Sequence, residues 1–186
     1  VNGSFRYSTS YRWFKGNTHI HSIASDGGMP LEKIAELYST AAYDFIFLTD
    51  HWISSDVERG LKNPPLLLLD GIELDGTDHT GALFHTVCLG KTDGISMEDG
   101  FENAIKKARE QKAIMILAHP RWSGNSFEDA NRWQFDGVEI YNHVCRWLNG
   151  KSNGLSYWDA MLKQNPGVLG FSVDDAHLIP EHPGWN

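Results

Sequence analysis

The stretch "HIHSIASD", residues 19–26, places two histidines one residue apart and an aspartate five residues after the second. Side chains at positions i and i+2 of a β-strand project to the same face of the sheet, with backbones roughly 7 Å apart. His19 and His21 therefore point the same way if they end a strand. Crowded imidazoles and carboxylates repel one another unless a cation lies among them. The stretch thus favours a divalent metal site at the end of a first strand.

The whole chain has the composition of one globular domain. Its 186 residues are 41% hydrophobic and 22% charged, so the chain can bury a substantial core. No apolar run approaches the roughly 20 residues that cross a bilayer. The formal net charge of −8 argues against a broad nucleic-acid surface. We therefore predict a single domain over residues 1–186 without membrane association.

Cysteine usage and the N-terminal residues leave the compartment open. Cys88 and Cys145 are too few for a disulfide scaffold and form no C-x-x-C pair, so we expect two buried thiols. The first residues lack the basic-then-apolar layout of a signal peptide, which slightly favours the cytoplasm. A signal peptide removed before Val1 is also compatible with the sequence. The oligomeric state is not predicted.

Short β-rich runs alternate with helical patterns along the chain. The seven candidate strands are residues 12–21, 44–51, 65–74, 84–90, 113–120, 135–143 and 167–177. Helices are predicted over residues 30–43, 96–112 and 155–165. The first of them has an apolar face formed by Leu31, Ile34, Ala35, Tyr38 and Ala42. Alternating strands and helices predict a mainly parallel sheet with helices outside, and seven such units could close into a barrel.

One connection departs from this pattern. Only eleven residues separate Glu73 from His85, and they include the turn-like "DGTDHTG" of residues 75–81. A parallel crossover needs a dozen or more residues. We therefore predict a local antiparallel hairpin that brings His85 close to Glu73.

Metal-binding residue types gather at the ends of the candidate strands. They are His19, His21, His51, Glu73, His119, His143, Asp175 and His177, with His85 at the start of the fourth strand. Each of them alone fits an ordinary structural role. In parallel α/β barrels, however, the active site lies at the carboxyl ends of the strands. Their shared placement therefore predicts one metal site.

Several motifs together resemble the polymerase-and-histidinol-phosphatase (PHP) family of metal-dependent phosphoesterases. They are "GNTHIHSIASDGGMP", "YDFIFLTDH", "GIEL", "FHTVCLG", "AHPRW", "VEIYN" and "DDAH". The resemblance runs from about Trp13 to His177 and implies a PHP-type fold, an α/β distorted (β/α)7 TIM-like barrel. Family members usually continue past the position where "HLIPEHPGWN" ends this sequence. Compared with the family, either the sequence lacks a C-terminal segment or this member is compact.

The resemblance also implies ligands for three divalent ions, for which mixed histidine and carboxylate donors suit zinc, manganese or iron. The first ion would be held by His19, His21, Glu73 and Asp175. The second would share Glu73 with His85 and His119. The third would be held by Asp26, His51 and His177. Asp26 replaces a histidine that some family members have at this position.

These expectations predict an enzyme that hydrolyses a phosphomonoester or phosphodiester, with a small molecule, such as a nucleotide, as substrate. A hydroxide bridging the two Glu73-linked ions would attack phosphorus. The predicted catalytic residues are Glu73, Asp175 and His143. His143 would be a leaving-group acid or a substrate contact, and Arg121 would clamp the phosphate with its forked guanidinium. A structural histidine and a surface arginine beside Trp122 are the competing interpretations.

Two other functions remain open. Barrels with a His-x-His start also occur in amidohydrolases. In that case we would expect a carboxylated lysine, or an equivalent group, that bridges two metals. The third strand ends in Glu73 and offers no lysine, so phosphoester chemistry is preferred. A non-catalytic metal-binding module would have lost ligands, and none is lost here. For Glu139 we expect a buried carboxylate with a hydrogen-bond donor, and for Asp174 a supporting role beside Asp175.

Overall fold

The computed structural model describes residues 10–56 and 61–179. Its elements are, in order, β1 (Gly16–Asn17), α1 (Leu31–Thr40), β2 (Phe45–Leu48), β3 (Leu67–Thr77), β4 (Leu83–Leu89), the 3-10 helix η1 (Met97–Asp99), α3 (Gly100–Glu110), β5 (Ile114–Leu117), α4 (Pro120–Ser123), α5 (Phe127–Arg132), β6 (Gly137–Asn142), α6 (His143–Asn149), α7 (Leu155–Leu162) and β7 (Leu169–Val173).

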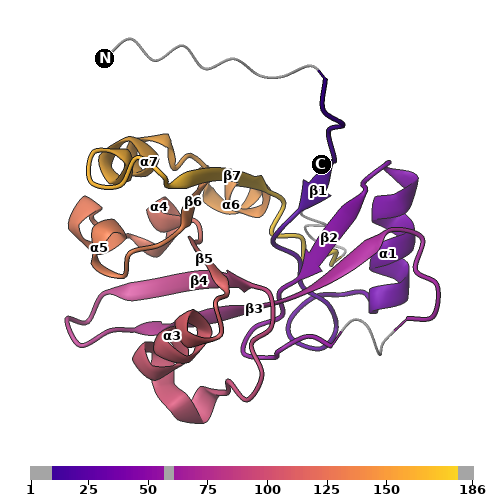
Figure 1. Ribbon diagram of the computed structural model, residues 1–186, viewed down its shortest axis with the longest axis horizontal. Coiled ribbons are helices and arrows are strands. Elements are labelled where there is room, and N and C mark those ends of the chain that lie inside the picture. The colour runs from indigo at the N-terminus through magenta and orange to yellow at the C-terminus, as the bar shows by residue number, and fades with distance from the viewer. Residues whose placement is uncertain (1–9, 57–60, 180–186) are drawn as a thin grey trace.

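The strands form one seven-stranded sheet in the order β1 to β7, and helices lie around its outside (Figure 1). The two ends of the sheet meet, because Ile20 and Ala176 form a parallel bridge and the backbone N–H of His21 donates to the carbonyl of Ala176 at 2.9 Å. The sheet is therefore a nearly closed barrel, and the predicted distorted seven-stranded α/β barrel is confirmed.

The predicted hairpin is also confirmed. β3 and β4 pair antiparallel, with Asp75 opposite His85 and Glu73 opposite Val87. β4 and β5 are antiparallel as well, which the sequence did not predict. β4 is the reversed strand, so its pairings with both β3 and β5 are antiparallel. The next two pairs, β5 with β6 and β6 with β7, are parallel. The reversal puts the start of β4, rather than its end, at the rim where the other strands end.

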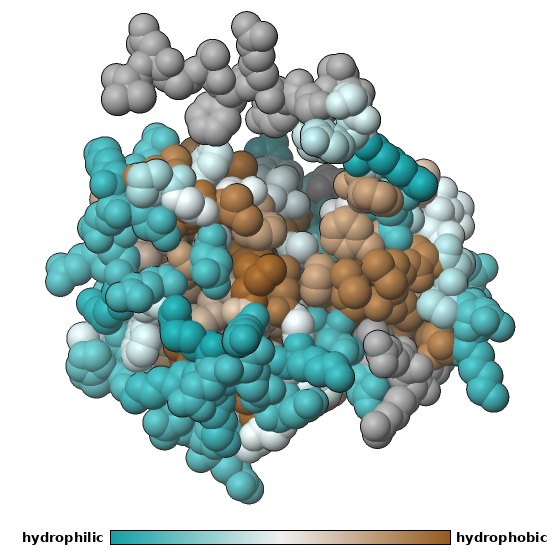
Figure 2. Space-filling view, in the orientation of Figure 1, coloured by the Kyte–Doolittle hydropathy of each residue, from teal (hydrophilic) through white to brown (hydrophobic). Residues whose placement is uncertain are grey.

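The helices pack as their apolar faces predict. On α1, Ile34, Ala35 and Tyr38 are buried against the β1–β3 side of the barrel. Ala42 was wrongly included in this face: the helix ends at Thr40, and Ala42 is exposed with a left-handed φ of 60°. The surface over α3 is hydrophilic, as its charged outer face requires (Figure 2). Among the described helices, none is long and apolar enough to cross a membrane.

Candidate metal centre

Four side-chain atoms from three parts of the barrel rim meet in its interior. The Nε2 atoms of His19 and His21 are 3.1 Å apart, and Glu73 Oε2 lies 3.0 and 3.1 Å from them. Asp175 Oδ1 lies 3.2 Å from both nitrogens. A tetrahedral ion with ligands at about 2.0–2.1 Å needs ligand atoms about 3.3–3.4 Å apart. The four atoms are therefore spaced much as around a single ion.

The hydrogen bonding and burial of these four side chains also indicate a cation site. Asp175 Oδ1 is buried, yet it makes no hydrogen bond in the part of the chain that the structure describes. Buried polar atoms normally have a hydrogen-bond partner or coordinate a metal. The four side chains are between 0% and 6% exposed, so water reaches them poorly. These donors fit a divalent cation.

Glu73 faces two groups of histidines with its two oxygens. Oε2 faces His19 and His21, whereas Oε1 lies 2.9 Å from His85 Nδ1 and 3.3 Å from His119 Nε2. A carboxylate in this position can bind a different ion with each oxygen. The β3–β4 hairpin creates this arrangement, because it carries both Glu73 and His85.

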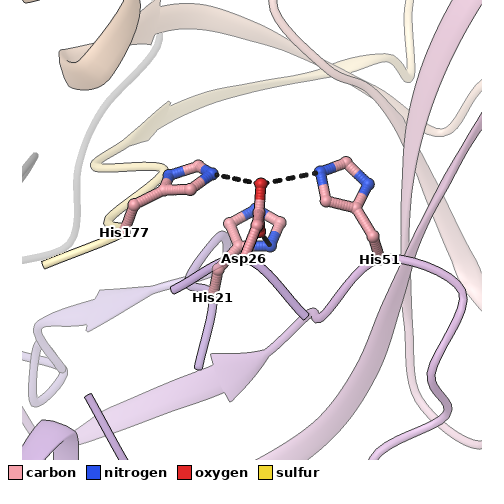
Figure 3. A group of neighbouring side chains, drawn as sticks. All are labelled: His21, Asp26, His51 and His177. Carbon is pink, nitrogen blue, oxygen red and sulfur yellow. Dashed lines mark hydrogen bonds and ion pairs between the residues drawn. The ribbon is translucent and has the colours of Figure 1, made fainter. Parts of the chain in front are cut away.

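A third group lies at the outer edge, where Asp26 points between His177 and His51 with His21 behind it (Figure 3). Asp26 Oδ2 is 3.2 Å from His177 Nε2 and 3.9 Å from His51 Nε2. His51 Nε2 is also 3.3 Å from Glu73 Oε2, so His51 can serve either group. The side chain of Asp26 is 53% exposed, which makes this the most open part of the cluster.

These groups surround a cavity of about 160 Å³. Its lining residues are Asp26, His51, Glu73, His85, His119, Trp122, Val144, Cys145, Leu148, Asp175 and His177. The structure thus brings together all the metal ligands that the sequence predicted, with His19 and His21 buried beneath the cavity floor.

Similarity to solved structures identifies the fold family of the chain. No protein-family model and no curated protein matches this sequence. Among solved structures, a two-domain protein from Bacteroides vulgatus that contains a predicted PHP-like metal-dependent phosphoesterase superposes with a TM-score of 0.66 and 20% identity. The match covers 94% of this chain.

The chain has the PHP fold. It spans 57% of the length of the Bacteroides protein. Two further structures share the fold: an amidohydrolase from Chromobacterium violaceum (TM-score 0.61, 15% identity, 92% of this chain and 90% of that one) and a protein predicted to be a metal-dependent phosphoesterase from Bifidobacterium adolescentis (0.63, 14%, 92% of each).

In this PHP fold, the backbone turns sharply where strands deliver predicted ligands. His119 and Asp175 have positive φ angles of 25° and 54°, and Trp52, directly after His51, has 55°. Such conformations cost on the order of 1–3 kcal/mol each for residues other than glycine and gather at functional sites. At His119 the turn leads straight into Pro120, the first residue of α4.

Three histidines are oriented through their second ring nitrogen. His19 Nδ1 lies 2.6 Å from Glu139 Oε1, and His51 Nδ1 lies 3.0 Å from Asp75 Oδ1. His177 Nδ1 donates to the carbonyl of Asp175 at 2.8 Å. In each case an acceptor holds the Nδ1 proton, so Nε2 is the nitrogen that can bind a metal once its own proton is displaced. The expected buried pairing of Glu139 is confirmed.

Two further aspartates hold the backbone around the site. Asp174 Oδ2 accepts from Asn17 Nδ2 and from the Tyr38 hydroxyl, each at 2.8 Å, which confirms its supporting role beside Asp175. Asp50 accepts from the backbone and hydroxyl of Ser22, both at 2.7 Å, and so holds the loop that leads to Asp26.

The supporting roles of Asp50 and Asp75 were not predicted from the sequence. For Asp50, a signal was available in the serine-rich "SIAS" loop, whose polar groups need acceptors. For Asp75, the only signal was its place in the same hairpin as Glu73.

The charges of the cluster shift the pKa values of its members. Burial lowers the pKa of His21, but the carboxylates of Asp175 and Glu73 raise it more, so that it reaches about 9. For Glu73, burial raises the pKa, but the positive His19 and its neighbours hold it well below its usual range. Without metal, carboxylates and imidazolium ions neutralise one another. Metal ions would take the place of those protons.

Two predicted residues lie outside this cluster. His143 Nδ1 faces the Tyr141 hydroxyl at 3.0 Å, and its Nε2 accepts from Trp147 Nε1 at 2.9 Å. It lines a separate surface depression with Arg146 and Trp147. Arg121 is exposed on α4 and is not among the residues that line the cavity. The predicted leaving-group acid and phosphate clamp therefore have no contact with the cluster to support them.

Both cysteines are free and buried, as predicted. Burial raises the pKa of Cys88 to about 12, so this thiol is not a ready nucleophile.

Proposed function

We propose that this protein is a metal-dependent phosphoesterase, a hydrolase of phosphomonoesters or phosphodiesters with a trinuclear metal site. The observation that carries the proposal is the position of Glu73, whose two oxygens face two groups of histidines inside a rim of further ligands. Solved structures of this fold include proteins predicted to be PHP-like metal-dependent phosphoesterases. Zinc, manganese and iron suit such mixed donors.

When bound, divalent ions would neutralise charge on phosphoryl oxygens and lower the pKa of water, so that a hydroxide nucleophile is available at neutral pH. The protein's own residues would hold these ions at fixed separations. His19, His21, Glu73 and Asp175 would form the buried end of the site. Asp26, His51 and His177 would form the open end, where the phosphate and its leaving group enter.

Glu139, Asp75 and the carbonyl of Asp175 would keep the ring protons of three histidines away from the cavity. This fixes the tautomer that can bind a cation. The low exposure of Glu73 and Asp175 would limit competition from water.

An amidohydrolase activity is the second candidate, because a protein described as an amidohydrolase shares this fold. The amidohydrolase hypothesis expects a carboxylated lysine or an equivalent carboxylate as bridge. No lysine lines the cavity within the described residues, and Glu73 occupies the bridging position. Phosphoester hydrolysis therefore remains the preferred function.

The test is a metal-reconstituted activity screen. Protein stripped with a chelator is reloaded with zinc, manganese or iron, its metal content is measured, and it is assayed with phosphomonoesters, phosphodiesters, cyclic nucleotides and cyclic amides. We expect up to three ions per chain and phosphoester turnover only in the loaded protein. Turnover of cyclic amides alone would establish the second candidate, and a protein that binds none of these metals would refute both.

A further inference from the structure

The cavity over the predicted metal centre has a second wall, which is mainly apolar. Beside the predicted metal ligands, it is lined by Trp122, Val144, Cys145 and Leu148. Val144 and Cys145 are buried, whereas Leu148 is 51% exposed. Half of the Leu148 side chain is therefore available for a ligand to cover.

This apolar wall is built into the elements that follow two of the strands. Trp122 lies on α4 and packs edge-on against His85 and His119, with ring centroids 5.4 and 5.1 Å apart. Val144 and Leu148 are four residues apart on α6 and so share one helix face. The wall thus stands directly beside the predicted ligands.

The charges that line the cavity come from the metal-binding cluster alone. Neither lysine nor arginine lines it in the described ranges 10–56 and 61–179. Its carboxylates are Asp26, Glu73 and Asp175, which the metal ions would neutralise. A second phosphate on a substrate would lie against the apolar wall without a cation, which is costly for a desolvated charge. Hydroxyl groups placed there would lose their hydrogen bonds to water.

We propose that the site selects a phosphomonoester whose leaving group is apolar or aromatic and carries no further phosphate. This rests on the proposed function. The phosphate faces the histidine and carboxylate side, and the leaving group covers Leu148 and Trp122. The cavity of about 160 Å³ suits a phosphate with a compact group attached. Leu148 is then a specificity-determining residue.

The test compares benzyl phosphate with glycerol phosphate on the metal-loaded protein. We expect kcat/KM to favour benzyl phosphate by at least about tenfold, from the apolar area that its ring buries. In Leu148→Ser this preference falls about fivefold, because half of a leucine side chain is lost from the contact. Leu155→Ser is the matched control: Leu155 is 47% exposed, on α7, outside the cavity lining, and its replacement leaves the preference unchanged.

A binding measurement separates this inference from the proposed function. Benzylphosphonate and methylphosphonate cannot be hydrolysed, and calorimetry gives their affinities for the metal-loaded protein. Tighter binding of benzylphosphonate that Leu148→Ser weakens, without turnover of any ester, supports the apolar subsite and refutes the phosphoesterase. Equal binding of the two phosphonates overturns the inference even if esters are hydrolysed. A preference for adenosine 3′,5′-bisphosphate over benzyl phosphate overturns it as well.

Discussion

Glu139 holds His19 in orientation: His19 Nδ1 lies 2.6 Å from Glu139 Oε1, and both side chains are buried. The other carboxylate oxygen, Oε2, accepts the backbone N–H of His119 at 2.8 Å and the amide of Asn142 at 2.9 Å. One carboxylate in β6 therefore orients two predicted ligands, His19 and His119, which are a hundred residues apart in the sequence. It does so without facing the cavity itself.

We expect Glu139→Gln to weaken metal binding about 10–100-fold, the usual effect of losing a carboxylate behind a ligating histidine. The amide keeps an oxygen for one donor but lacks the charge that makes His19 a strong donor. Chelator competition measures the affinity, and circular dichroism verifies the fold. Glu98→Gln, on the exposed surface of η1, is the control. Equal affinities in the two variants would show that Glu139 has only a packing role.

Glu73→Gln should abolish turnover more completely than His51→Ala. The two oxygens of Glu73 lie within 3.3 Å of two different groups of histidines, whereas His51 offers a single nitrogen toward the cluster. We expect single-turnover rates at least about a hundredfold below wild type for Glu73→Gln and a smaller loss for His51→Ala. Near-normal turnover in Glu73→Gln would refute the bridging role.

The stability of the metal-free protein should fall as pH rises from about 6.5 to 9. Folding raises the pKa of His21 from 6.5 to about 9, so the protonated ring stabilises the fold fully below pH 6.5 and loses this contribution as pH approaches the folded value. The groups that face His21 are His19, Asp26, Glu73, Asp175, His51 and His177.

Urea unfolding of chelated protein at pH 6, 7.5 and 9 measures this dependence, and zinc-loaded protein is the comparison. Metal should remove most of the decline, because the ion replaces the proton between the same carboxylates. A free energy of unfolding that stays constant over this range in the chelated protein would contradict the prediction.

For Arg121→Ala we now expect a change in kcat/KM of less than about threefold, with metal content unchanged. The side chain is exposed and does not line the cavity, so solvent screens its charge from a bound phosphate. Kinetics and elemental analysis of Arg121→Ala and Arg121→Lys decide the matter. A loss above about tenfold with metal retained, not rescued by lysine, would establish the bidentate clamp that the sequence suggested.

Local patterns predicted that several candidate ligands lie close together. The two-residue spacing of His19 and His21 predicted that they share one face, and they do so although β1 already ends at Asn17. The short 75–81 turn forces a hairpin that brings His85 to Glu73. Both are local consequences of chain geometry, and both are observed. The alternation of strands and helices likewise predicted the barrel, because few other arrangements bury such elements.

The roles of His143 and Arg121 could not be predicted in this way. Their positions after strands six and five resemble those of the ligands, but side-chain direction depends on helix packing. α6 begins at His143 and turns its ring toward Tyr141 and Trp147, while α4 leaves Arg121 exposed. A residue at a strand end can face the cavity or leave it, and the following helix decides which.

The sequence by itself determined which residues can bind metal and at which end of the barrel they lie, because strand periodicity and turn length act over a few residues. Only the tertiary structure decided the distances between these donors and which apolar wall faces them. Those outcomes depend on barrel closure at Ile20 and Ala176 and on where α6 places Leu148. Contacts between segments more than a hundred residues apart leave no periodic pattern in the chain.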